Sequence, residues 1–389
     1  MHIPLSAPDL NDTDKNAVLE VLNSRTLSIG PKTLEFEKAA AEIAGTKHGI
    51  AVNSGTSGLH LCVRAAGIRE GDEVITSPFS FVASANCILF ERATPVFVDI
   101  DPITGSITPE AIEAAITPRT KALLPVHIFG RPCAIAPIME IARKRGLPVI
   151  EDSCEAIGAT YFGKRVGSFG QSGVFAFYPN KQVTTGEGGV IVTNDDDVAR
   201  QCRSMRNQGR AASNWLEHDL IGYNYRLSDV NCALGLNQLK RVDEIVAARS
   251  RVVHMYDQAL RHISEVIPPP PDEPNCEISW FVYVVRLQDE FTGADRDHVL
   301  LELQRQGVEC RNYFPPIHLQ AVYRRLFGYK DGAFPVTERV AARTIALPFF
   351  NRLSAEQIEY VAAALEKAIA TLKPKRYVEA GIPAARSVL

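Results

Sequence analysis

The sequence predicts an α/β protein, in which a large domain holds a mostly parallel β-sheet between helices and a smaller α+β domain follows it. Between residues 48 and 195, short apolar runs alternate with helix-like segments, which is typical of successive β-α units. Pro268–Pro271 can continue neither a helix nor a central strand, so we expect a domain junction near it. Beyond the prolines, one strand-like run and two amphipathic segments indicate the smaller domain.

The expected elements of the large domain follow one another closely. We expect strands at Gly49–Val52, Glu73–Thr76, Thr94–Val98, Ala122–Val126, Pro148–Glu151, Gly173–Tyr178 and Gly189–Thr193. We expect the intervening helices at Ser57–Ala66, Val82–Glu91, Pro109–Ala115 and Ile135–Arg145. Helix-like sequence then dominates from Asp196 to about His262, because apolar residues recur there at a helical spacing.

The smaller domain is expected to contain a strand at Ile278–Leu287 and helices at Ala294–Gln306 and Ser354–Leu372. The tail Pro374–Leu389 has no clear periodicity. We therefore place the large domain at residues 1–250 and the small domain at residues 251–389, with the first residues of the chain free to pack on the small domain.

Composition excludes several classes of protein. The 389 residues are 46% hydrophobic and 22% charged, which is enough for a sizeable core. The formal net charge of −3 argues against a general nucleic-acid or membrane-surface binder. We recognise no signal peptide and no run of ~18 apolar residues. The eight cysteines form no CxxC pair, so we expect reduced thiols in a cytoplasmic protein. No HExxH or EF-hand pattern occurs, and we expect no metal site.

A run of small residues, Asn53–Gly58, lies between a predicted strand and a predicted helix. The N-terminus of a helix exposes backbone N–H groups and the positive end of the helix dipole, so it can bind an anion. The hydroxyls of Ser54, Thr56 and Ser57 could add donors. Taken alone, the run is more simply explained as an ordinary N-cap with a tight glycine turn.

Two further patterns follow predicted strands. Glu151 and Asp152 lie at a strand end, where α/β proteins bind ligands, although one acid could simply cap the next turn. Lys181 comes after another strand and precedes the glycine-rich segment Thr184–Gly189. Alone, this lysine is more simply a solvated surface residue. The glycine-rich segment is not a GxGxxG fingerprint and precedes a strand-like run, so it gives only weak support for dinucleotide binding.

Together, an anion-binding loop, a carboxylate at a strand end and a downstream lysine are what pyridoxal 5′-phosphate (PLP) requires. Its phosphate would lie at the helix N-terminus, and the Lys181 amine would form a Schiff base with its aldehyde. Asp152 would keep the pyridine nitrogen protonated, so that the ring acts as an electron sink. Asp152 and Lys181 are 29 residues apart (181 − 152), so only the fold can bring them together.

Across residues 3–370, the sequence resembles the DegT/StrS-type PLP-dependent nucleotide-sugar aminotransferases, a branch of the fold-type-I aminotransferases. The motifs that carry the resemblance, in order, are Gly30-Pro31 with Phe36-Glu37, VNSGTSGLHL, SPFSFVASAN, PVFVDID, PVHIFGRP, VIEDSCEAIGA, FYPNKQVTTGEGGVIVTND, IGYNYRLSDVNCALGLNQL and LPFF. The family fold implies a mostly parallel seven-stranded sheet in the large domain.

The resemblance implies a role for the residues that match these motifs. Lys181 matches the Schiff-base lysine, which also carries the proton between Cα and the cofactor C4′. Asp152 matches the partner of the pyridine nitrogen, and Phe81 matches the aromatic residue that stacks on the ring. Glu155 matches a position, often Gln or His, that contacts the ring hydroxyl.

The remaining matches concern the phosphate and the substrates. Gly55, Thr56 and Ser57 match the phosphate loop. Asn224 matches a residue that reaches the phosphate from the neighbouring subunit, which implies a homodimer with shared active sites. The candidates for donor or sugar contacts are Arg226, Tyr313 and His318.

The sequence departs from the family pattern at two of these places. Ala176 stands where a serine often contacts the phosphate, so one donor is missing, and Ser57 is a candidate to compensate. Glu155 would place a carboxylate beside the ring oxygen; because two anions in contact repel, one of them must hold a proton. Lysine rather than histidine at position 181 favours transamination over the deoxygenation carried out by sugar dehydratases of this fold.

The resemblance thus implies transfer of an amino group from L-glutamate to a keto group of a nucleotide-linked deoxy-sugar, with pyridoxamine phosphate as the intermediate. The motifs NKQVTTGEGG and GYNYRLSD are most similar to those of the branch that acts on 4-keto-6-deoxyhexoses, as in perosamine synthesis. The alternatives are an aminocyclitol or 3-keto-sugar aminotransferase of the same fold, or a non-catalytic PLP-fold regulatory protein. Lys181 and Asp152 together argue against the regulatory protein.

Overall fold

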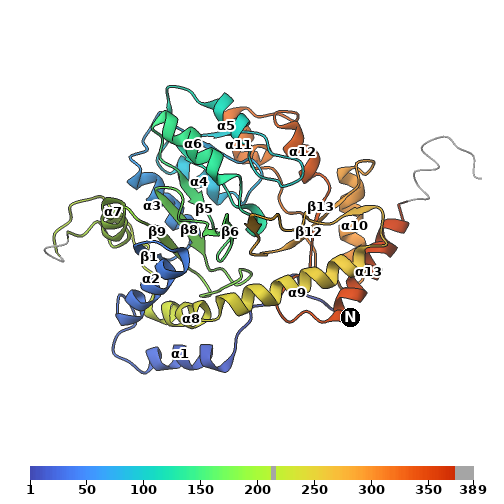
Figure 1. The fold of residues 1–389 in the computed structure, drawn as a ribbon, viewed down its shortest axis with the longest axis horizontal. Helices are drawn as coiled ribbons and strands as arrows, with labels where there is room; N and C mark the ends of the chain where they lie inside the picture. The colour runs from blue at the N-terminus through green and yellow to red at the C-terminus, as the bar shows by residue number, and fades with distance from the viewer. Residues whose placement is uncertain (212–215, 373–389) are drawn as a thin grey trace, which may run out of the picture.

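The computed structural model describes residues 1–211 and 216–372, and within them the main sheet has seven strands in the order β1, β9, β8, β5, β4, β2, β3 (Figure 1). The strands are β1 (His48–Val52), β2 (Glu73–Thr76), β3 (Thr94–Phe97), β4 (Thr120–Leu124), β5 (Ile150–Asp152), β8 (Ser172–Ala176) and β9 (Gly189–Thr193). β9 runs opposite to the other six strands of this sheet; single parallel bridges, Leu123 to Val149 and Val126 to Asp152, join β4 to β5. The predicted mostly parallel sheet is confirmed.

Helices cover both faces of this sheet. On one side, Ile50, Val174 and Ile191 share a core with residues of the helices α3 (Gly55–Ala65), α4 (Ala83–Leu89) and α7 (Asp196–Arg206). The helices α5 (Pro109–Ala115) and α6 (Ile135–Arg145) join the same core where it continues around β2 and β4, whose adjacent residues Val74 and Ile75, and Leu123 and Leu124, all belong to it. The alternate residues Ala51, Phe175 and Val190 share a second core with α2 (Pro31–Ala44) and α8 (Asp229–Leu239). Because side chains alternate along a strand, β1, β8 and β9 contribute to both cores, and the result is a three-layer α/β arrangement.

A second group of elements has a core of its own. An antiparallel sheet, in the order β10 (Val266–Ile267), β12 (Tyr283–Leu287) and β13 (Thr344–Leu347), packs with α10 (Gly293–Arg305) and α13 (Ala355–Ala370). Ile3, at the start of the chain, is buried in the same core and pairs with Val308. In Figure 1, the N-terminus accordingly lies beside α13.

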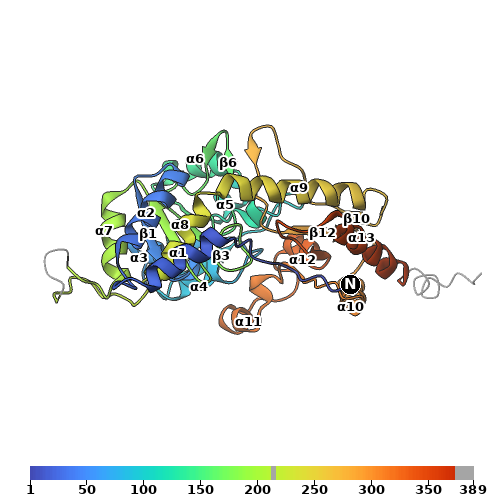
Figure 2. The same ribbon diagram turned by 90° about the horizontal axis from the view of Figure 1, so that it is seen from below.

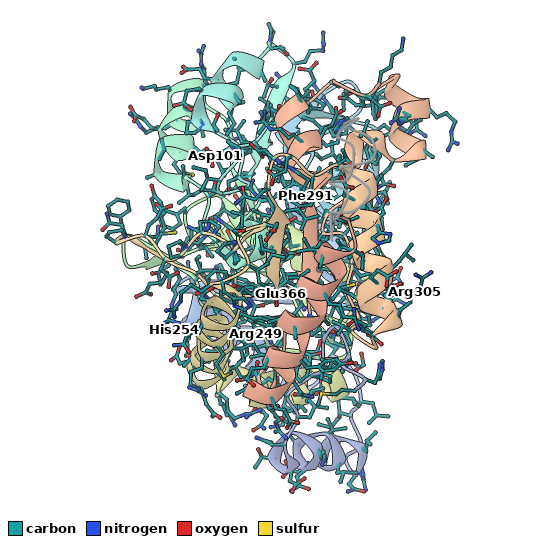
Figure 3. The ribbon with its side chains drawn as sticks, turned by 90° about the vertical axis from the view of Figure 1, so that its right-hand side faces the viewer. Asp101, Arg249, His254, Phe291, Arg305 and Glu366 are labelled. Atoms are coloured by element: carbon teal, nitrogen blue, oxygen red, sulfur yellow. The ribbon has the colours of Figure 1, made fainter. Side chains whose placement is uncertain are left out.

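The long helix α9 (Val242–Leu260) runs from the first group of elements to the second (Figure 2). Its first turns supply Ile245 to the core beneath α2 and α8, whereas Val252 and Tyr256 belong to the core around β12. Figure 3 shows the side formed by α9 and α13, with Arg249 and Glu366 labelled on them. The predicted division at residue 250 falls inside this helix and stays a prediction.

Shorter elements complete the chain. They are α1 (Asp12–Leu22), the 3₁₀ turns η1 (Ile128–Gly130) and η2 (Ile317–Leu319), β6 (Thr160–Tyr161), β7 (Lys164–Arg165), β11 (Cys276–Glu277), α11 (Ala321–Phe327) and α12 (Pro335–Ala341). Within the described ranges, we find no helix with the length and apolar character needed to cross a membrane. The tail predicted to lack periodicity, 374–389, lies outside the described residues.

Two expected elements differ in the structure. Between α7 and α8, the described residues form turns and single bridges rather than a helix, and Gly209 there has φ +76°, which a right-handed helix excludes. The strand expected from Ile278 begins only at Tyr283. The residues before it bond elsewhere, because the N–H groups of Ser279 and Phe281 donate to the carbonyls of the η1 turn.

The contact between β9 and the start of α3 leaves no room for a side chain. A Cβ on Gly189 would lie 2.7 Å from the Ser54 carbonyl carbon and 2.9 Å from the Gly55 nitrogen. We expect Gly189→Ala to lower the free energy of unfolding by about 1–3 kcal/mol, because backbone must shift to accept the methyl group. Urea unfolding at fixed protein concentration measures this.

Gly293→Ala is the matched control for that substitution. A Cβ on Gly293, in the first turn of α10, would meet Ala342 at an ordinary 3.7 Å. Its effect should stay within about 0.5 kcal/mol. Equal effects of the two substitutions would contradict the close contact at Gly189.

Candidate active site

A cavity of about 860 Å³ opens where β4, β5 and β8 end and α3 begins. It brings together the predicted site residues Gly55, Thr56, Phe81, Asp152, Glu155, Lys181 and Tyr313. Its other wall comes from residues after β11 and just before η2, including Phe281 and Phe314. The carboxyl ends of parallel strands therefore form the site, as the α/β topology predicts.

The start of α3 forms one end of the cavity. Ser54 is the N-cap, and its Oγ accepts a hydrogen bond from the Ser57 N–H at 3.1 Å. A Cβ on Gly55 would lie 2.8 Å from the Ala176 Cβ and 2.9 Å from the Cys154 Sγ. Glycine at position 55 thus lets the helix start directly against β8, with the free N–H groups of its first turn at the cavity.

The two acids of β5 have separate environments. The Asp152 carboxylate lines the cavity and accepts hydrogen bonds from the Ser84 Oγ at 2.6 Å and the Cys154 N–H at 3.2 Å. Glu151 is fully buried on the opposite side, where His127 Nε2 lies 3.0 Å from it and three backbone N–H groups of the 167–170 turn donate to it. Asp152 is therefore the acid available to a ligand, and Glu151 stabilises the turn.

Lys181 and Glu155 form an ion pair inside the cavity. The Lys181 Nζ lies 3.3 Å from Glu155 Oε1 and 3.8 Å from the centre of the Phe281 ring, a cation–π distance. The second oxygen, Oε2, accepts the Phe129 N–H at 2.9 Å. Burial raises the pKa of the Glu155 carboxyl, and the neighbouring ammonium of Lys181 opposes this shift only in part.

Three residues that sequence reasoning missed, Phe281, Arg249 and Ser84, support this pair and Asp152. Arg249 donates from Nε to the Trp280 carbonyl at 2.7 Å and from a terminal nitrogen to the Phe281 carbonyl at 2.9 Å. Burial lowers the pKa of Arg249 to about 10, so it stays charged at neutral pH. Phe281 and Arg249 lie in helical or apolar runs that look like core. Ser84 lies in the motif SPFSFVASAN, where a hydroxyl within an otherwise apolar predicted helix is a signal that could have identified it.

Four predicted site residues do not line this cavity. Ser57 is buried and its Oγ donates to Asn53 Oδ1 at 2.6 Å, while Arg226 donates to Asn207 Oδ1 at 3.1 Å. Asn224 is exposed, on a segment beside the start of α3. His318 is fully buried, with Nε2 3.0 Å from Glu338 Oε1. Their predicted roles stay predictions.

The comparison with known proteins agrees with this geometry. The model of the DegT/DnrJ/EryC1/StrS aminotransferase family matches residues 8–366. A GDP-perosamine synthase from Caulobacter vibrioides is 41% identical over 368 residues, which cover 94% of this chain and 98% of the relative.

Two solved structures are similar over nearly the whole chain. Helicobacter pylori PseC, an aminotransferase of pseudoaminic acid biosynthesis, has a TM-score of 0.90 and 32% identity, covering 95% of this chain and 100% of its own. The PLP form of Streptococcus pneumoniae Spr1654 has a TM-score of 0.90 and 26% identity, with coverages of 96% and 100%. The family is one of PLP-dependent enzymes, and the predicted fold type and enzyme class are confirmed. This chain belongs to the DegT/DnrJ/EryC1/StrS aminotransferase family.

Proposed function

We propose that this protein uses PLP to transfer an amino group from L-glutamate to the keto group of a nucleotide-linked 4-keto-6-deoxyhexose. The observation that carries the proposal is the position of the Lys181 amine. It lies in one cavity with the Asp152 carboxylate and the start of α3, although the three come from separate parts of the chain.

The residues present fit the cofactor. A volume of about 860 Å³ lies within the roughly 300–1,000 Å³ usual for ligand sites, so cofactor and sugar can enter together. Gly55 allows a phosphate to approach the N–H groups of α3, and Phe81, 60% exposed, offers a ring face at the wall. The Asp152 carboxylate, held by Ser84, suits a protonated ring nitrogen. When bound, PLP supplies an aldehyde and an electron-withdrawing ring.

The chain's own residues then have distinct tasks. Lys181 would hold PLP through Nζ, and the same amine would be free for proton transfer once the amino donor is bound. The freed amine takes the proton from the donor Cα and later returns a proton to the sugar carbon, so that Nζ is base in one half-reaction and acid in the other. Asp152 keeps the positive charge on the ring nitrogen. Phe281 and Glu155 hold the amine at the edge of the cavity.

The protonation state of Glu155 decides whether the site can accept the oxygen of the cofactor ring. Its carboxyl is buried, faces Lys181 and carries the raised pKa described above. In the cofactor-free site this carboxyl pairs with the Lys181 ammonium; with PLP bound, a proton on the Glu155 carboxyl would remove its repulsion with the oxygen of the cofactor ring. We infer that Glu155 donates a hydrogen bond to that oxygen, where Gln or His would do so in relatives of this family.

The substrate class is supported by the relatives. The Caulobacter relative is named a GDP-perosamine synthase, PseC is described as an aminotransferase of pseudoaminic acid biosynthesis, and Spr1654 as a putative sugar aminotransferase. The net charge of −3 fits an anionic small molecule that is recognised by local donors rather than by a basic surface. We therefore assign the ketone to a sugar rather than to a cyclitol.

We also propose a homodimer. Large apolar side chains on and beside the 220–226 segment are exposed: Phe90 52%, Leu220 38% and Ile221 77%. Such a set is unusual on a monomer surface and suits a partner of the same chain. Asn224 and Arg226 would then complete the partner's site, which accounts for their position outside the cavity of their own subunit.

The first test is spectroscopic and then chemical. PLP-loaded protein should absorb near the visible edge, and L-glutamate should shift that band. With glutamate, a nucleotide-linked 4-keto-6-deoxyhexose should be aminated faster than a 3-keto sugar or a keto-cyclitol. A missing band would overturn the enzyme assignment, whereas preference for another ketone would overturn only the substrate.

Replacing the lysine tests its role directly. We expect Lys181→Ala to abolish turnover, because no other amine then reaches the reacting carbon, while circular dichroism and the unfolding midpoint show a folded protein. Lys164→Ala, an exposed lysine on β7, serves as the control and should keep full turnover. Turnover retained by Lys181→Ala would contradict the assignment of Lys181 as the catalytic amine.

The protonation of Glu155 predicts a pH dependence of stability. Because the pKa in the folded protein is raised from 4.5, the folded state keeps a proton that the unfolded chain has lost. The free energy of unfolding of cofactor-free wild type, relative to Glu155→Gln, should therefore fall as pH rises above about 4.5, until the folded carboxyl also ionises. Urea unfolding at a series of pH values measures the difference. A difference that grows with pH would mean that Lys181 lowers this pKa overall.

The dimer can be tested at Ile221. A charge placed there would be buried without a partner, so Ile221→Glu should raise the dimer dissociation constant by about tenfold or more. Analytical ultracentrifugation over a concentration series measures this. Leu301→Glu, at a 55% exposed position on α10 far from the segment, should leave the constant unchanged. The proposed interface is wrong if the two variants behave alike.

A further inference from the structure

Residues Tyr223–Arg226 lie against the α3 helix of their own subunit. Tyr223 and Tyr225 bond through their N–H groups to the carbonyls at the end of α7, and Asn224 pairs with Asn207 there. The Tyr225 carbonyl accepts the Asn53 N–H at 2.9 Å. The segment is therefore attached both to α7 and to the loop that opens α3.

The two tyrosine rings of this segment point to the same side. Their centres are 4.8 Å apart with an angle of 8° between the rings, and the His60 ring lies 4.9 Å from Tyr223 and 5.9 Å from Tyr225. Because side chains alternate along an extended segment, Asn224 between them points the opposite way, and it is exposed. The direction of Asn224 thus follows from the way its two neighbours are held.

His60 is the polar group that holds them. It lies on α3 and is only 3% exposed. Its Nε2 lies 2.8 Å from Glu91 Oε1, which can only accept, so that nitrogen carries a proton. Burial lowers the pKa of His60, which leaves Nδ1 free to accept the Tyr225 hydroxyl at 3.2 Å. Arg64 donates to both oxygens of Glu91 and keeps the carboxylate charged and in place.

We propose that His60 is a positioning residue that acts in trans: through Tyr225 it orients Asn224 of its own subunit toward the cofactor-phosphate site of the partner. This inference rests on the proposed shared-site dimer. The helix α3 would then have two tasks. Its first turn binds the phosphate in its own subunit, and His60, farther along the helix, orients the Asn224 that reaches the site of the partner. His60 itself does not line the cavity, so it touches neither cofactor nor substrate.

The first measurement uses homodimers. His60→Leu removes both polar contacts of the imidazole, and Tyr225→Phe removes only the hydroxyl. We expect the PLP dissociation constant, measured by the absorbance band, to rise about tenfold in His60→Leu and less in Tyr225→Phe. His48→Leu is the matched control, because His48, on β1, also pairs with a carboxylate, but with that of Asp196 at the start of α7. Unchanged PLP affinity in both His60→Leu and Tyr225→Phe would overturn the proposal.

The decisive measurement uses mixed dimers, purified through two different tags. A dimer of one His60→Leu subunit and one Lys181→Ala subunit has a single lysine-bearing site, in the His60→Leu subunit, and that site receives Asn224 from a subunit with intact His60. PLP affinity and turnover at this site should return to the wild-type values per lysine. Affinity as weak as in the His60→Leu homodimer would show that His60 acts within its own subunit and would overturn the proposal.

The reciprocal dimer makes the same test in the other direction. In a dimer of a wild-type subunit and a Lys181→Ala/His60→Leu subunit, the lysine-bearing site lies in the wild-type subunit. Its PLP dissociation constant should rise about tenfold, because the Asn224 that reaches this site comes from the altered subunit. If His60→Leu does not fold, Tyr225→Phe takes its place in both dimers. The wild type paired with Lys181→Ala separates the two proposals, since loss of the absorbance band or of the dimer there would count against the proposed function instead.

Discussion

The ion pair between Lys181 and Glu155 is the contact on which the site depends. Burying two charges costs more than their attraction returns unless further groups satisfy them, and removing one partner leaves an uncompensated buried charge. Here the second oxygen of Glu155 accepts the Phe129 N–H, and the Phe281 ring covers the ammonium. The pair therefore requires the loop after β4, the loop after β5, the β8–β9 connection and the chain before β12 to be in place together.

This requirement explains why both cores of the molecule are needed for one site. Arg249, on α9, donates hydrogen bonds to the carbonyls of Trp280 and Phe281. These bonds attach the chain just before β12 to α9. A helix is stiff over its length, so α9 holds the two cores at a set spacing. The cavity forms where these parts meet, and changes in either core should be felt at the lysine.

The sequence predicts the sheet well because its strands are short apolar runs bounded by turns, and Asp152 and Lys181 follow two of those runs directly. It does not predict β11 and β12 correctly, since the residues from Ile278 to Val282 are apolar but bond to the η1 turn instead of a strand, which is a tertiary effect. Phe281 and Arg249 cannot be predicted from sequence for the same reason, because their roles depend on tertiary contacts: the Phe281 ring with the Lys181 ammonium, and Arg249 with the carbonyls before β12. The motif VNSGTSGLHL contains His60, but the resemblance implies no role for it as it does for Asn224, because the role of His60 appears only through a tyrosine 165 residues away (225 − 60).

The central claim is that the amine of Lys181, held by Glu155, is the group that binds the cofactor. Borohydride reduction of the PLP-loaded protein, followed by peptide mass mapping, tests it most directly, because reduction makes the bond between cofactor and amine permanent. The account predicts that the pyridoxyl group is found on the peptide containing Lys181 and on no other lysine. Labelling of a different lysine, or no labelling of a protein that still aminates its substrate, would contradict it.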